Sequence, residues 1–317
     1  MPLCWVATTD DHPFANLGDA LSPVIVSALS GRSIKHQHFD ANSARFACVG
    51  TIGQDLKGGT IHLWGTGIDA KKKAINQGRS SYQCPDNTTF HVHALRGPFS
   101  AQVFSSQGVD VPPVYGDPVW FLSSLMAPAA QKQYELGVIV HLTELASLKD
   151  ASLLKEHLLR YQIPTELKSS IRIITTLVPP TFDAIEQKVK EITSCKRIVS
   201  TSLHGLVIAE TYGIPCLYLR NAHQGVAQIA LYDEQERIDQ RMRDFYAGVG
   251  CKQLFTYGQK RNQRTDWNDV IQAIDTHWQP IEWNPHSFLE TFPLPLAFNP
   301  LRERLIVDQR DYNKIQF

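Results

Sequence analysis

The sequence predicts an α/β fold of two domains with parallel sheets, and two observations predict it. Short apolar runs of strand length alternate with helical patterns along most of the chain, which is typical of parallel strands connected by helices. The chain has 317 residues, more than a single hydrophobic core usually takes, so two domains of about 150 residues each are expected.

The composition is that of an ordinary globular protein. Thirty-one basic residues balance 31 acidic ones, so the charge pattern favours neither nucleic acid nor an anionic membrane as a partner. The six cysteines are scattered and form no CxxC pair, which favours a reducing, cytoplasmic compartment. The first residues do not resemble a signal peptide, and no apolar run is long enough to cross a bilayer. At most peripheral membrane association is expected, and the residues indicate no oligomeric state.

The clearest βαβ unit spans residues 196–220. A helix is predicted for residues 203–212, between apolar strand-like runs at 198–199 and 215–219. Ser202 occupies the N-cap position and His204 falls in the first turn, where helices in open α/β sheets bind anions. A histidine there either contacts an anion and moves a proton near neutral pH, or merely packs. The residues alone leave both possibilities open.

The N-terminal region repeats this arrangement. Residues 3–7 predict a strand, and Asn16, Gly18 and Asp19 precede a helix expected from Ala20 to Ser30. In a functional interpretation, Gly18 permits close approach of a ligand and Asp19 orients substrate hydroxyls. The interpretation that the residues alone favour is structural, with Asp19 as an N-cap and Gly18 in a turn.

Other strand ends carry polar or glycine residues. The apolar run 61–64 ends in Gly65, Thr66 and Gly67, which let a backbone approach a ligand but are weak signals alone. Arg96 follows a strand predicted for residues 90–95, where it suits binding of carboxylate or phosphate as well as a surface role.

His91 and His93 lie on one face of that strand. Two ligands without a third do not make a metal site, so none is predicted.

The domain boundary is expected near residues 127–133, a polar and proline-bearing segment, which gives domains of residues 1–130 and 131–317. A strand at 137–140 is followed at once by His141, with Glu144 close behind. The other expected elements are helices at 99–106, 119–126, 152–161, 182–193, 234–246, 266–277 and 285–291, and strands at 44–49 and 171–175.

Several chemistries lack their local signatures. The chain contains no P-loop, HExxH or GxSxG motif and no GxGxxG after the first strand, so no nucleotide, zinc or nicotinamide cofactor is predicted. An anion-binding crevice remains, with Arg96, His141 and His204 projecting from strand ends. This indicates a transferase that acts on a phosphorylated or carboxylated small molecule.

Six segments extend this prediction through a resemblance. They are NLGDALSP (16–23), WGTGI (64–68), LRGPFSA (95–101), GDPVWFL (116–122), LGVIVH (136–141) and STSLHGLVIAETYGIP (200–215). In this order they resemble the polysaccharide pyruvyl transferase family, particularly its exopolysaccharide ketal-forming branch. The resemblance implies a GT-B-like fold, with two Rossmann-like domains with parallel sheets facing across a cleft. It also implies phosphoenolpyruvate as co-substrate and a saccharide as acceptor. The expected acceptors include lipid-linked saccharides at the inner face of the membrane.

The resemblance also implies roles for individual residues. His204 is the first candidate for proton transfer and His141 the second, and either Asp19 or Glu144 would accept a proton from the attacking hydroxyl. The donor would be bound by Arg96, Ser202, Leu203 and Gly205, and the acceptor side would comprise Asn16, Gly18, Gly65, Thr66, Gly67 and Glu144. Many relatives have arginine where this chain has Ser202, and Arg96, Arg197 and Arg220 stay open as its substitutes.

Two alternative functions remain at this stage. A GT-B glycosyltransferase that uses a nucleotide sugar would present the same two-domain pattern. A catalytically impaired saccharide-binding relative, having lost the donor arginine at Ser202, would do so as well.

Overall fold

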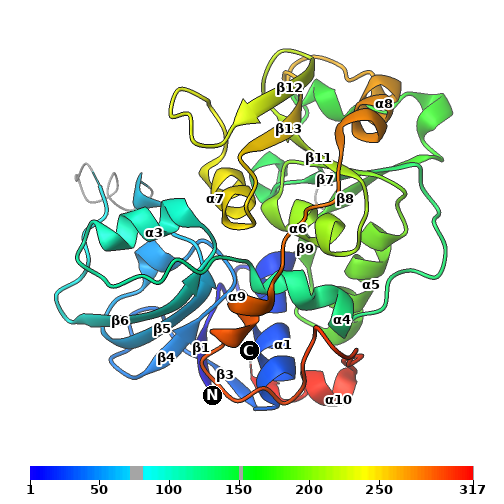
Figure 1. The fold of residues 1–317 in the computed structure, drawn as a ribbon. Coiled ribbons are helices and arrows are strands. Elements are labelled where there is room, and N and C mark those ends of the chain that lie inside the picture. Colours follow the sequence, from blue (N-terminus) through cyan, green and yellow to red (C-terminus); the bar gives the residue numbers. More distant parts are fainter. Residues whose placement is uncertain (72–80, 150–152, 317) are drawn as a thin grey trace.

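The computed structural model describes residues 1–71, 81–149 and 153–316, and their strands form two six-stranded sheets (Figure 1). The first sheet has the order β14-β3-β1-β4-β5-β6, and its described pairings are parallel. Its strands are β1 (Pro2–Cys4), β3 (Ile34–His36), β4 (Arg45–Ala47), β5 (Gly59–Thr66), β6 (Thr88–Leu95) and β14 (Ile315–Gln316). The mixed α/β character and the parallel pairing agree with the prediction.

The second sheet has the order β12-β13-β11-β10-β7-β8. Its strands are β7 (Leu136–Val140), β8 (Ile171–Thr175), β10 (Ile198–Ser200), β11 (Cys216–Arg220), β12 (Gly225–Ala230) and β13 (Gln253–Gly258). Among the described strands of this second sheet, only the edge strand β12 runs antiparallel to its neighbour. The carboxyl ends of β7, β10 and β11 therefore lie at the same edge of this sheet.

The described helices cover these sheets. They are α1 (Leu17–Ser30), α3 (Pro98–Ser105), α4 (Leu122–Leu125), α5 (Phe182–Thr193), α6 (Leu203–Thr211), α7 (Gln240–Gly248), α8 (Trp267–His277), α9 (His286–Glu290) and α10 (Gln309–Tyr312). Helix α5 has the predicted bounds, and its apolar side chains at helical spacing are buried.

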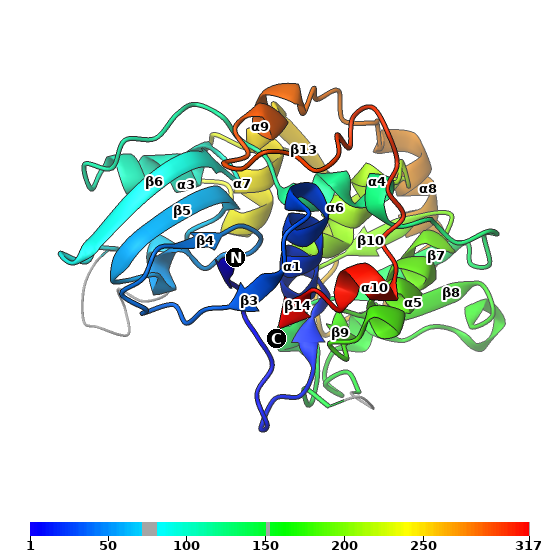
Figure 2. The same cartoon turned by 90° about the horizontal axis from the view of Figure 1, so that it is seen from below.

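Helix α1 lies between the two sheets (Figure 2), and every residue in it except Asp19 is buried. The start of α1 is held by a segment from the second half of the chain, because β2 (Ala15–Asn16), just before the helix, pairs with β9 (Leu177–Val178). The Leu17 N–H also donates to the Thr176 carbonyl at 2.8 Å. The first turn of α1 is thereby held beside the second sheet.

The starts of helices α1 and α7 differ from the prediction. Helix α1 begins at Leu17, so Gly18 and Asp19 lie in its first turn and Asn16 is the N-cap. Helix α7 begins only at Gln240, because the Asp239 side chain caps it there.

The helix predicted for residues 152–161 is absent from its described part, which begins at residue 153. This part contains a bridge between Leu145 and Leu154 and a single 3-10 turn at Leu159–Tyr161. Leu158 and Tyr161, just before and within this 3-10 turn, belong to the apolar cluster of the second sheet, so tertiary packing overrides the helical pattern.

The end of the chain returns to the first sheet. Strand β14 pairs with β3, and Phe288 of α9 stacks on Trp64 of β5 with ring centroids 4.6 Å apart. Phe288 and β14 belong to the predicted domain of residues 131–317, but they pack on the first sheet. The division into two domains across a cleft stays a prediction.

No helix in the described ranges combines the length and apolar character needed to cross a membrane.

Candidate active site

A cavity of about 550 Å³, here called the histidine cavity, brings together residues from both halves of the chain. Its lining includes Asn16, Asp19, His141, Ser202, His204 and Arg241. Predicted site residues from the regions of residues 16–19, 141 and 202–204 therefore meet in space.

Three helices begin at this cavity. Asn16, Ser202 and Asp239 are the N-caps of α1, α6 and α7, and all three line it. The side chains of Asn16 and Ser202 make no capping hydrogen bond. Helix N-termini present backbone N–H groups and the positive end of the helix dipole. The N-terminal ends of α1 and α6 therefore favour an anion, whereas the Asp239 carboxylate already caps the N-terminal end of α7.

His204 is held between a buried carboxylate and a glycine. Its Nε2 lies 3.5 Å from Oδ2 of Asp117, which is fully buried, while Oδ1 of Asp117 accepts from the Val119 N–H at 3.0 Å. A Cβ on Gly18 would lie 1.8 Å from Nδ1 of His204. Gly18 therefore makes room for the imidazole, whose Nδ1 lies against this glycine. Nε2 of His204 faces Asp117 but makes no hydrogen bond with any described residue.

Arg241 is fixed by two neighbours. Its Nε and Nη2 donate to the two carboxylate oxygens of Asp239 at 3.0 and 2.7 Å, and its Nη1 donates to Nε2 of His141 at 2.8 Å. A paired carboxylate of this geometry orients a guanidinium and keeps it charged. Arg241 is thus a positioned cation in the wall of the histidine cavity.

His141 is neutral at physiological pH in this arrangement. Burial and the nearby Arg241 charge lower the pKa of His141 to about 4. Arg241 lies within hydrogen-bond distance of Nε2, while Nδ1 lies 2.8 Å from the Thr143 hydroxyl and accepts from the Thr143 N–H at 3.3 Å. Both ring nitrogens are occupied, which favours a positioning role over proton transfer.

Glu144 lies outside the histidine cavity, in a neighbouring pocket of about 320 Å³ that shares His141 and Arg241 with it. Its buried carboxylate accepts from Arg160 and Tyr161, and from Arg261 at 3.3 Å. With these donors in place, Glu144 holds arginine side chains rather than a substrate hydroxyl.

The structure does not bring Arg96 into the lining of the histidine cavity. It is 1% exposed, and its Nε donates to Asp244 of α7 at 3.1 Å. Its Nη1 donates to Thr51, which does line the cavity. Arg96 therefore connects the end of β6 to α7, the helix that carries Arg241.

The other open substitutes for the family arginine also lie elsewhere. Arg197 pairs with Glu135 and Asp275 before β10 begins, and Arg220 is not among the residues that line the cavity.

Gly65, Thr66, Gly67 and Gly205 lie behind the cavity wall. A Cβ on Gly65 would meet Pro118 at 2.4 Å, and one on Gly67 would meet the Arg96 guanidinium at 2.3 Å. The buried Thr66 hydroxyl donates to the Ala47 carbonyl at 2.7 Å. These four residues pack next to other residues and do not line the cavity, whereas Leu203 lines it directly.

Sequence reasoning missed Asp117, Asp239 and Arg241. Asp117 lies in the segment GDPVWFL, but nothing local predicts that it approaches His204. Asp239 does carry a signal, because an aspartate before a helical pattern is a common N-cap. Arg241 follows from no motif.

Within the described part of the chain, no group of three or more His, Cys, Asp or Glu side chains is arranged to hold a metal ion.

Comparison with known proteins gives a family match. Residues 51–223 match the family model of polysaccharide pyruvyl transferases, a range that includes Asp117, His141 and His204. An uncharacterized protein of Acanthamoeba polyphaga mimivirus is 26% identical over 178 residues, which are 55% of this chain and 53% of that protein. This chain therefore spans about half the length of the relative it matches.

Proposed function

Because this chain belongs to the polysaccharide pyruvyl transferase family, we propose that it transfers pyruvate from phosphoenolpyruvate to a hydroxyl pair of a poly- or oligosaccharide, forming a cyclic ketal. The observation that carries this proposal is the meeting of three helix N-termini with Arg241 and His204 in one cavity. A GT-B-like arrangement of two domains, residues 1–130 and 131–317, is part of the proposal. So is a cytoplasmic location, with lipid-linked acceptors at the inner membrane face.

The donor wall of the cavity comes from the second-sheet half of the chain. Arg241 would pair with the phosphate or carboxylate of phosphoenolpyruvate, and the N-terminus of α6 after Ser202 would receive the other anionic group. In this assignment Arg241 takes the place first expected of Arg96. His141 keeps Arg241 in position, and no metal or other cofactor is required.

The acceptor wall comes from the first-sheet half. Asn16, Asp19, Thr51 and Asp69 line it, and Asn16 donates to Asp19 at 3.3 Å. A carboxylate accepts hydrogen bonds from sugar hydroxyls, and a side-chain amide both accepts and donates them. Asp19 is the proposed acceptor of the first hydroxyl proton.

In the proposed reaction, His204 gives a ring proton to C3 of phosphoenolpyruvate. One sugar hydroxyl adds to C2 and passes its proton to Asp19. Phosphate leaves as the bond from C2 to its bridging oxygen breaks, and the second hydroxyl then bonds to C2 and closes the ketal. The protons lost by the two hydroxyls balance the one gained by C3 and the one carried away by phosphate. The buried carboxylate of Asp117 lies beside Nε2 of the His204 imidazole.

The test is phosphate release from phosphoenolpyruvate in the presence of defined oligosaccharides, with mass spectrometry of the glycan product. His204→Gln should abolish release, and Arg241→Gln should raise KM for phosphoenolpyruvate. Arg237→Gln is the matched control, because Arg237 is an exposed arginine shortly before α7. Full activity of His204→Gln would refute the assignment.

Ligand stabilisation separates the alternatives. Thermal stabilisation by a nucleoside diphosphate but not by phosphoenolpyruvate would instead favour a nucleotide-sugar glycosyltransferase. Saccharide binding without phosphate release, also in Ser202→Arg, would favour a non-catalytic relative.

A further inference from the structure

A second cavity, of about 680 Å³ and here called the distal cavity, shares no lining residue with the histidine cavity. It is formed by the last turns of α6 and α7, the residues after α8, and the first residues of β11 and β13. Helix α6 separates the two cavities, with His204 in its first turn and Glu210 in its last. Because β11 and β13 start here, the distal cavity lies at the opposite edge of the second sheet from the proposed reaction site. Its volume falls within the range of about 300–1,000 Å³ that ligand sites occupy.

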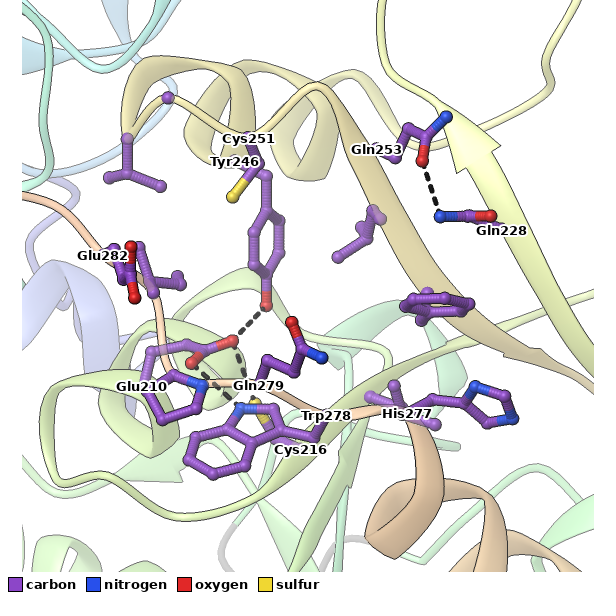
Figure 3. Close-up of a pocket in the computed structure, with 17 residues that line it drawn as sticks. Glu210, Cys216, Gln228, Tyr246, Cys251, Gln253, His277, Trp278, Gln279 and Glu282 are labelled. Carbon is purple, nitrogen blue, oxygen red and sulfur yellow. Dashed lines mark hydrogen bonds between the residues drawn. The ribbon is translucent and has the colours of Figure 1, made fainter.

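Glu210 is the polar centre of the distal cavity. Figure 3 shows Tyr246 and Trp278 directed at its carboxyl group from different sides. Oε1 accepts from the Tyr246 hydroxyl at 3.0 Å and from the Cys216 thiol at 3.4 Å, and Oε2 accepts from Nε1 of Trp278 at 3.1 Å. A carboxylate oxygen can accept from two donors, so Oε2 retains capacity for a ligand hydroxyl.

Apart from His277 and Glu282, the other polar side chains that line the distal cavity are uncharged donors and acceptors. Gln228, Gln253 and Gln279 line the cavity, and the first two are exposed and joined by a hydrogen bond of 2.5 Å. A carboxamide both donates and accepts, as a sugar hydroxyl does. No lysine or arginine occurs among the described residues that line this cavity, so phosphorylated or carboxylated ligands such as phosphoenolpyruvate lack a cation here.

Aromatic and aliphatic side chains complete the lining. Trp278 and Phe255 are partly exposed in it, beside Pro280 and Ile281. The electron-rich face of an aromatic ring attracts weakly positive C–H groups, and a pyranose ring presents such groups on its faces. Aromatic surface, carboxamides and a carboxylate together suit a neutral carbohydrate.

We infer that the distal cavity binds a neutral segment of the acceptor polysaccharide, apart from the segment that reacts at His204. This inference rests on the proposed function for the nature of the polymer. A polysaccharide long enough to occupy both cavities would bind more tightly than a short one. Once one of its segments is bound, the second segment binds within the same complex and not from free solution.

The test measures binding of neutral hexose oligosaccharides, from disaccharides to decasaccharides, to the whole protein by calorimetry. The double variant Gln228→Ala, Gln253→Ala should weaken binding of the long oligosaccharides about tenfold, the loss expected for one or two hydrogen bonds. Trp278→Phe should weaken it as well. The thermal shift caused by phosphoenolpyruvate should stay unchanged in each variant. Gln272→Ala is the matched control, because Gln272 is exposed on α8 and lies outside the cavity lining.

Two outcomes would overturn the inference. One is the absence of oligosaccharide binding to the unaltered protein, and the other is unchanged binding in both the double variant and Trp278→Phe. Failure of the proposed function has a different signature. Oligosaccharide binding that depends on Gln228 and Gln253, without phosphate release from phosphoenolpyruvate, would refute pyruvyl transfer and leave the distal site standing.

Discussion

Acidification should destabilise this protein through His141. The pKa of His141 is about 4 in the folded state against an ordinary 6.5, because burial and the Arg241 charge disfavour its protonation. Between these pH values the unfolded chain binds more protons than the folded one, so the free energy of unfolding falls as pH drops from about 6.5 to about 4. At 1.36 kcal/mol per pKa unit, the loss reaches at most about 3 kcal/mol, since partial solvent contact of the ring reduces it.

The assay is urea unfolding at pH steps from 8 to 4, with the variant His141→Gln as reference. Glutamine keeps an acceptor for Arg241 but does not titrate. The difference in unfolding free energy between wild type and His141→Gln should therefore fall with acidification. The other titrating groups cancel in this difference. His12→Gln, in an exposed loop, is the control and should follow the wild-type pH dependence. A difference that stays constant from pH 8 to 4 would refute the reasoning.

Three further perturbations test other contacts. Gly18→Ala should lower kcat about a hundredfold, because its Cβ would lie 1.8 Å from Nδ1 of His204 and displace the ring; unchanged single-turnover phosphate release would contradict this. Asp244→Asn should cost about 3–5 kcal/mol of unfolding free energy in urea, because Arg96 would be left buried without its counter-charge; a loss under about 1 kcal/mol would contradict it. Burial raises the pKa of Glu210 to about 7, so the folded state binds this proton more tightly. Stability relative to Glu210→Gln should then fall by up to about 3 kcal/mol as pH rises from about 4.5 to about 7, and a difference independent of pH would exclude the raised pKa.

The sequence predicted the local features of the fold well, because hydrophobic periodicity and capping act over neighbouring residues. The strand at residues 171–175 and the helix at 182–193 have the predicted bounds, and His204 lies in the first turn of its helix. The family resemblance was confirmed for residues 51–223. The roles assigned to individual site residues stay predictions.

Pairing between distant segments could not be predicted. Asp117 and His204 are brought together across 87 positions, and His141 and Arg241 across 100. A local pattern marks where a strand ends, but only the packing of the sheets and of α1 decides which ends face one another. Burial of a charged group, as for Arg96, depends equally on a partner that is far away in sequence.

Strand β14 has a consequence for how this protein folds. It forms the outer edge of the first sheet and pairs with β3, and the paired residues Ile34 and Ile315 lie 281 positions apart in the sequence. Until this distant pairing forms, the β3 edge has no neighbour on that side, and an open edge invites pairing with other chains. Because closing so long a loop is slow, the first sheet is expected to be completed late in folding, and partly folded molecules are expected to associate through the β3 edge before then.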